Sequence, residues 1–153
     1  MKKSILKGCG FVLGAAGGFI AANAAGVAYL ANVAGKKMKS NELGNNMMYS
    51  SALNQKTLDI NPDTDHAYIN CVSGVSEVRL NGLPVHYDMY IELGSFCSVF
   101  IIKLPADVKV NIEGTGFKNT VKNMREEVTD ESLPTVHLVL DNAKLSTIII
   151  TEV

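Results

Sequence analysis

The chain contains no tryptophan, only three cysteines and few charged residues. The cysteines form no C-x-x-C pair, so the sequence gives no support for a zinc site or for thioredoxin-like redox chemistry. The chain also lacks the G-x-S-x-G elbow of serine hydrolases and the lysine that completes a phosphate-binding loop. These absences argue against an enzyme, and we expect no catalytic residues, no cofactor and no metal site.

Negative charge is missing from the first 40 residues, which carry six lysines and no acid. Residues 41–153 carry eight basic and all fifteen acidic residues, a net charge of −7. An acidic domain without a basic face argues against nucleic acid as a partner. The sequence therefore predicts a basic-flanked apolar helix over residues 1–40, a polar linker over 41–56 and an acidic domain over 57–153.

The stretch from Gly8 to Gly35 contains 28 consecutive uncharged residues. About 20 residues suffice for a helix to cross the hydrocarbon core of a bilayer. Three interpretations are open. The segment is a signal peptide cleaved after Ala22-Asn23-Ala24, which leaves a secreted chain beginning at Ala25; a single-pass membrane anchor; or a helix that packs against other copies.

The low hydrophobicity of this segment favours packing against copies. Small residues recur at every fourth position, on one side of a helix, and such a strip lets another helix approach closely. The predicted helix-packing residues are Gly10, Gly14, Gly18, Ala22 and Gly26. We therefore expect a homo-oligomer that also contacts membrane lipids. Lysines balance across the helix, and the short segment before it favours an extracytoplasmic β-domain.

From residue 57 the pattern changes to short runs of alternating apolar residues, typical of half-buried strands. Such runs occupy residues 85–93, 108–113 and 135–141. Two other runs, 97–104 and 146–153, are apolar throughout and predict strands covered on both faces. Turn residues separate the runs at intervals of about eight to twelve residues. The expected fold class is mainly β: one apolar N-terminal helix followed by an all-β domain, either a stacked solenoid or a sandwich.

The stretch LPADVKVNIEGTG, residues 104–116, joins the end of one strand to a short turn, an alternating strand and a Gly-x-Gly turn. With INCVSGVSEVRL before it and LVLDNAKLSTIII after it, this order resembles the toast-rack β-domains of bacterial envelope proteins. That group includes the C-terminal domain of LiaF-like envelope-stress proteins. The resemblance covers residues 57–153 and implies a β-rich, non-catalytic module near a membrane. It brings no site residues with it.

Two cysteines, one acidic stretch and three histidines are the side chains whose chemistry could form a site. Cys71 and Cys97 could form a disulfide outside the cell, or they are two small buried thiols. The stretch DINPDTDH, residues 59–66, imitates the start of a calcium loop but lacks its later glycine and glutamate, which favours an Asx-rich turn. Three histidines, His66, His86 and His137, are expected at separate solvent-facing or edge positions.

Two functions follow as expectations. The first is a non-enzymatic, membrane-associated envelope protein that self-assembles through its small-residue helix and displays the β-domain. The alternative is a monomeric, membrane-anchored envelope-stress sensor whose β-domain binds a partner or ligand.

Overall fold

The computed structural model describes residues 2–40 and 44–153, with side chains from residue 21 onward. Within these residues a single helix, α1 (Lys2–Ser40), precedes ten strands. The strands are β1 (Asn46–Ala52), β2 (Gln55–Ile60), β3 (His66–Val72), β4 (Val75–Leu80), β5 (Asp88–Phe96), β6 (Val99–Leu104), β7 (Lys109–Glu113), β8 (Thr120–Asn123), β9 (Thr135–Lys144) and β10 (Thr147–Glu152). The expected fold class is confirmed: the chain is mainly β, with one N-terminal helix.

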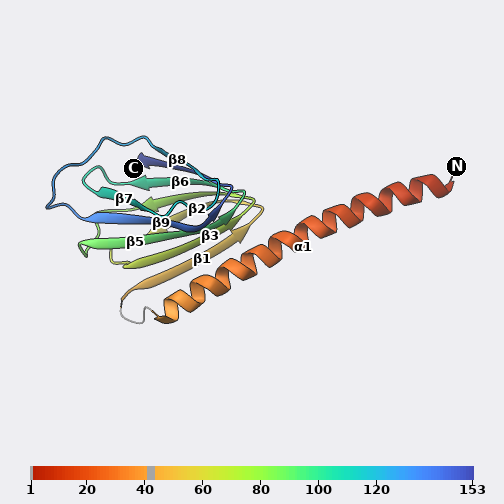
Figure 1. Ribbon diagram of the computed structural model, residues 1–153, viewed down its shortest axis with the longest axis horizontal. Coiled ribbons are helices and arrows are strands. Elements are labelled where there is room, and N and C mark those ends of the chain that lie inside the picture. The colour runs from red at the N-terminus through yellow and green to blue at the C-terminus, as the bar shows by residue number, and fades with distance from the viewer. Residues whose placement is uncertain (1, 41–43) are drawn as a thin grey trace.

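The strands form two five-stranded sheets in which every pair is parallel. Odd-numbered strands make one sheet, here sheet A, and even-numbered strands make the other, sheet B. Each pair of consecutive strands therefore forms one coil of a stack (Figure 1). This β-solenoid-like stacking is compatible with the toast-rack resemblance.

The last coil does not lie at the end of the stack. Sheet A has the order β1-β3-β5-β9-β7, and sheet B has the order β2-β4-β6-β10-β8. The coil of β9 and β10 is thus inserted between the third coil and the coil of β7 and β8. The final strands of the sequence lie inside the stack.

Alternating side chains from both sheets meet between them and form the core. On β5 these are Met89, Ile91 and Leu93, and all three are fully buried. Predicted strand 85–93 is confirmed only from residue 88, because Val85 and Tyr87 lie in the preceding turn and are exposed. For run 135–141, the inward face of Val136, Leu138 and Leu140 is confirmed.

Two expectations are corrected in the strands. Runs 97–104 and 146–153 are not covered on both faces: their burial alternates, and the outward Ile101 and Ile149 are only half-buried. The stretch 41–56, predicted as a linker, instead contains β1 and the start of β2. Its polar residues are compatible with a strand because β1 is an edge strand with one strand neighbour, β3.

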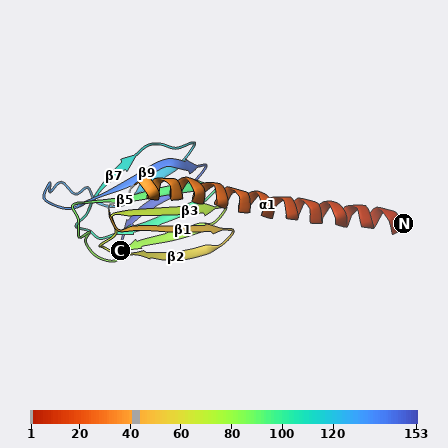
Figure 2. The ribbon, with the colours of Figure 1, turned by 90° about the horizontal axis from the view of Figure 1, so that it is seen from below.

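Helix α1 packs on the outer face of sheet A, against β1, β3 and β5 (Figure 2). Asn23, Leu30 and Ala34 are buried on the helix, and Tyr68 and Val72 are buried beneath it on β3. The C-terminal half of the uncharged run therefore covers a protein surface. Among the residues whose side chains the structure describes, from residue 21 onward, no helix combines the length and apolarity needed to span a bilayer.

Candidate functional site

A polar contact fixes the end of α1 on sheet A. Lys37 Nζ lies 2.5 Å from Glu92 Oε1, and the Asn142 side chain donates to the same oxygen at 2.8 Å. The Glu92 side chain is only 14% exposed, so its charge needs these partners. The pair therefore sets the position of the helix along the sheet.

A glycine lets the helix approach the sheet closely. A Cβ at Gly94 on β5 would collide with Asn70 Oδ1 and lie 3.3 Å from Leu30 Cδ2 of the helix. Asn70 is buried and donates to Ser50 Oγ at 3.0 Å, so it has little freedom to move aside. Gly94 therefore makes room both for a buried hydrogen bond and for the helix above it.

The predicted helix-packing strip is only partly within the described side chains. Gly10, Gly14 and Gly18 lie outside them. Gly26 is half-buried, and a Cβ there would meet the Val72 side chain at an ordinary 3.5 Å. Ala22 is exposed and, with Phe96, lines a small groove between α1 and the sheet. The last member of the strip therefore packs on the chain's own sheet.

The five turns from sheet A to sheet B share one backbone feature. Each contains one non-glycine residue with φ between 50° and 54°, in the sparsely populated left-handed region. These residues are Leu53, Ser73, Cys97, Lys118 and Leu145. The turns stack because the backbone N–H of one donates to a carbonyl of the next, as from Ser73 to Phe96 at 2.9 Å and from Cys97 to Lys144 at 3.1 Å.

Small polar side chains stabilise these turns by hydrogen bonds to the backbone. Asn119 donates to the carbonyl of Ala143 at 2.8 Å and accepts from the backbone N–H of Ser146 at 3.0 Å. Ser98 Oγ donates to the carbonyl of Cys71 at 2.7 Å. This repeat was not predicted from the sequence. Its signal is a residue of the Asn, Gly or Ser type directly after each left-handed residue, at irregular spacing along the chain.

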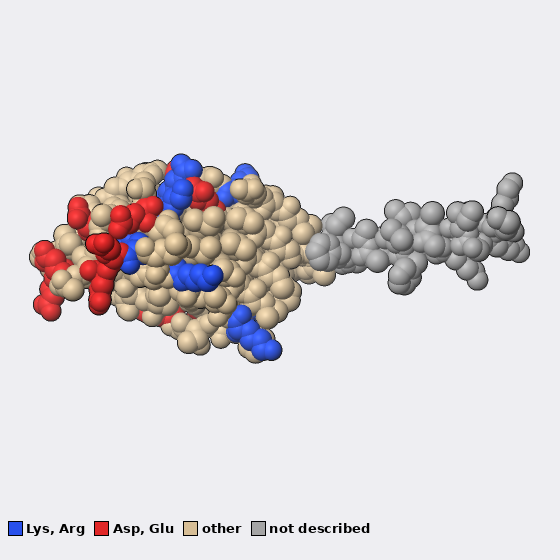
Figure 3. Space-filling model, turned by 90° about the horizontal axis from the view of Figure 1, so that it is seen from above, with Lys and Arg blue, Asp and Glu red and all other residues tan. Residues whose placement is uncertain are grey.

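We call the surface of these five turns the corner ridge; it comprises residues 52–56, 72–75, 96–99, 116–120 and 143–147. Four large apolar side chains project from it, with exposures between 42% and 54%: Leu53, Phe96, Phe117 and Leu145. The corner ridge contains no acidic residue. It carries three exposed lysines: Lys56, Lys118 and Lys144. On the face shown in Figure 3, acidic side chains gather at the end opposite the helix.

The sequence predicts separate positions for the three histidines, but the structure brings two of them, His66 and His137, together. Parallel register places His66, Tyr90 and His137 in one row on the outer face of sheet A. Their rings stack, with centroids 4.7 Å apart for the first pair and 4.5 Å for the second. His86 lies nearby, with its Nε2 3.5 Å from Asp65. Sequence separation hid this arrangement, since the register was unknown.

Carboxylates surround the row of rings. His137 Nδ1 is 2.5 Å from Glu113 Oε1, and its Nε2 is 3.2 Å from Asp88 Oδ1. Burial lowers the pKa of His66, against the opposing effect of Asp65 and Glu92. Among the described side chains, no group of three His, Cys, Asp or Glu residues could hold a metal ion. Asp65 of the calcium-like stretch instead accepts from the backbone N–H of Asn45 at 2.6 Å.

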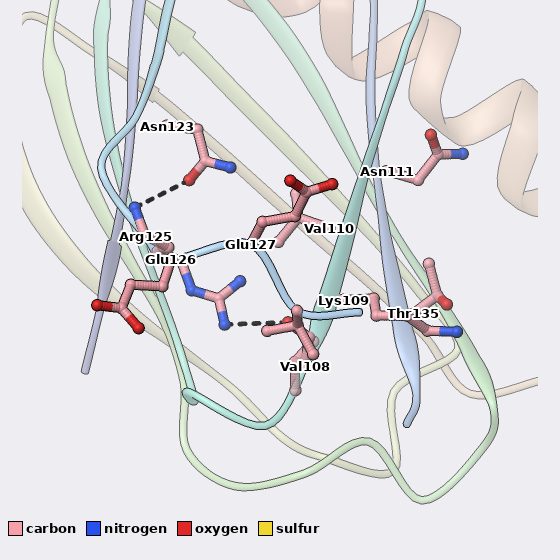
Figure 4. A pocket seen from close by; sticks show the side chains of 10 residues that line it. Val108, Lys109, Val110, Asn111, Asn123, Arg125, Glu126, Glu127 and Thr135 are labelled. Carbon is pink, nitrogen blue, oxygen red and sulfur yellow. Dashed lines mark hydrogen bonds between the residues drawn. The ribbon is translucent and has the colours of Figure 1, made fainter. Parts of the chain in front are cut away.

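A hollow of about 470 Å³ lies at the β7 end of the stack (Figure 4). Val108 and Val110 line one side, and the segment containing Arg125 and Glu127 lines the other. The Arg125 guanidinium donates to three backbone carbonyls, those of Pro105, Ala106 and Val108, at 2.6–3.0 Å. Its role is therefore to hold the turn that precedes β7.

The two cysteines of the β-domain are both free thiols. Cys71 is buried in the core, whereas Cys97 is exposed on the corner ridge. The expectation of two buried thiols thus holds for Cys71 and not for Cys97.

Comparison of the chain with protein-family models, with curated proteins and with solved structures gave no match. The chain is therefore described by its architecture: a parallel, two-sheet β-solenoid-like domain with an N-terminal helix docked on one sheet.

Proposed function

We propose that the chain is a non-enzymatic, membrane-associated structural protein of the bacterial cell envelope, which self-assembles through α1 and displays its β-domain. One observation carries this proposal. Helix α1 is divided: its C-terminal half packs on sheet A, while the uncharged segment Gly8–Ala21 continues the helix beyond the β-domain (Figure 1). An uncharged helix that projects from a folded domain requires another surface to cover it.

The length of this segment supports assembly in addition to lipid contact. Its 14 residues span about 21 Å at 1.5 Å per residue, less than the ~30 Å hydrocarbon core. The segment is rich in glycine and alanine, which contribute little to membrane insertion. Copies packed along Gly10, Gly14 and Gly18 would gain contacts that lipid alone supplies poorly.

Replacing Gly14 and Gly18 by leucine tests the assembly. The double variant should dissociate into smaller species in mild detergent, because leucine side chains separate the helices, while it stays in the membrane fraction. Ala16→Leu, on the opposite side of the helix, is the control and should leave the assembly intact. Native mass spectrometry measures both, and an unchanged oligomer in the double variant would contradict the proposal.

A monomeric, LiaF-like envelope-stress sensor is the second candidate. The observation that favours it is the row of histidine and tyrosine rings among carboxylates on the outer face of sheet A. This candidate predicts a monomeric full-length chain that tolerates leucine at both glycines. The same mass measurement therefore separates the two functions.

A further inference from the structure

The following inference rests on the membrane association proposed above. We propose that the corner ridge is a lipid-contacting surface, which seats the β-domain on a membrane that contains anionic lipids. Three independent features of the ridge support this: its apolar side chains, its charge and its position beside the helix.

The apolar side chains stand on a rigid base. Phe96 and Phe117 are 47% and 54% exposed, although backbone hydrogen bonds join their turns to neighbouring turns: the N–H of Ser73 donates to Phe96, and that of Phe117 donates to Ala143. Leu53 and Leu145 extend the same surface at 45% and 42% exposure. Large apolar groups grouped on one exposed surface mark a binding site more often than scattered ones do.

The charge of the ridge is opposite to that of the domain. Lys56, Lys118 and Lys144 are exposed there without any acid, although residues 41–153 carry a net charge of −7. Lysines with long apolar stems suit the region of anionic headgroups at a membrane surface. A second copy meeting ridge to ridge would instead place like charges together. The charge pattern therefore favours lipid over a symmetric dimer.

The ridge lies where the helix leaves the β-domain. Ala22, Asn23 and Gly26 of α1 share a groove of about 210 Å³ with Val72, Ser73 and Phe96 at the ridge. A membrane that receives the segment before Ala22 would thus meet the ridge first. The strands of sheet A end at the ridge, so the row of His66, Tyr90 and His137 would lie farther from the lipid.

The absence of tryptophan from the chain allows a direct test. We would introduce one tryptophan at a time into the full-length protein, as Phe96→Trp, Phe117→Trp and, as the control, Leu83→Trp. Leu83 is 47% exposed, like Phe96, but lies in the turn after β4, at the other end of the strands. Each variant is reconstituted into vesicles of phosphatidylcholine and phosphatidylglycerol, with and without brominated acyl chains that quench tryptophan on contact.

We expect brominated lipid to quench the tryptophans at positions 96 and 117 and to leave that at position 83 bright. Removing the ridge charges in Phe117→Trp, by Lys56→Gln, Lys118→Gln and Lys144→Gln, should lower the quenching. The matched changes Lys103→Gln, Lys109→Gln and Lys122→Gln should not.

Different failures have different meanings. If the protein floats with the vesicles but neither ridge tryptophan is quenched, the ridge proposal is overturned and membrane association stands. Blue-shifted but unquenched emission would show that another copy covers the ridge. Equal quenching at position 83 would show that lipid contacts both ends of the β-domain without preference for the ridge. Either result overturns the ridge proposal. Protein that does not float with vesicles would overturn the ridge and the membrane association together.

Discussion

At the residue scale, close approach at Gly94 explains how the helix and the sheet fit together. Gly94→Ala should destabilise the fold by about 1–3 kcal/mol, because the new methyl group collides with the buried Asn70 amide. Gly35→Ala is the matched control: a Cβ there meets nothing within 4 Å, and alanine should stabilise the helix by about 0.5–1 kcal/mol. Urea unfolding midpoints measure both effects, and a neutral Gly94→Ala would show that Gly94 and Asn70 do not pack as described.

His66 makes stability depend on pH. Burial lowers its pKa in the folded state below the ordinary value of 6.5, so the folded chain binds fewer protons than the unfolded chain between the two pKa values. Stability should therefore fall as the pH drops from about 6.5 towards the folded pKa. His66→Gln should reduce this acid-induced loss, whereas His86→Gln, on a 60% exposed side chain, should keep it. Urea midpoints across this range measure the slopes, and equal slopes in wild type and His66→Gln would rule out the effect.

At the scale of elements, the docked half of α1 is held by Leu30. Leu30 is 7% exposed and reaches Gly94 on β5. Leu30→Ala should weaken docking by about 2–3 kcal/mol and speed amide exchange in residues 23–37 by roughly 30-fold or more, while core strands stay protected. Tyr29→Ala, at a 64% exposed position, should change neither. Uniform loss of protection across the β-domain would show that helix and sheet unfold as one unit.

The sequence predicts the positions of the strands better than it predicts the surfaces against which the elements pack. Alternation identifies β9 through Val136, Leu138 and Leu140, because burial between two sheets imposes a period of two. It misses β1, where an edge strand carries polar residues. The alternation pattern also cannot show which half of an uncharged helix contacts protein. A leucine that packs against a sheet, such as Leu30, and a leucine in lipid have the same sequence signal.

The candidate surfaces were harder still to predict, because they depend on register. His66, Tyr90 and His137 are neighbours only through parallel pairing of β3, β5 and β9, and the last coil is inserted out of chain order. The corner ridge likewise assembles five turns with irregular spacing. No local pattern around any one of these residues carries that information.

At the scale of the whole molecule, the polar and apolar features are separated along the strands. The ridge, with three lysines and no acid, lies beside the point where the helix leaves, and acidic side chains gather at the other end on the face in Figure 3. Such polarity suits a domain displayed from a membrane by its helix. It also suits repeated copies held side by side, since every copy would present the same end outward.

The most direct test of this account is the intact mass and assembly size of the native full-length protein, taken in mild detergent from the membrane fraction. We predict a full-length chain in a large homo-oligomer. A full-length monomer would contradict self-assembly and leave the sensor as the better function. A chain that begins at Ala25, or no protein in the membrane fraction, would contradict the whole account.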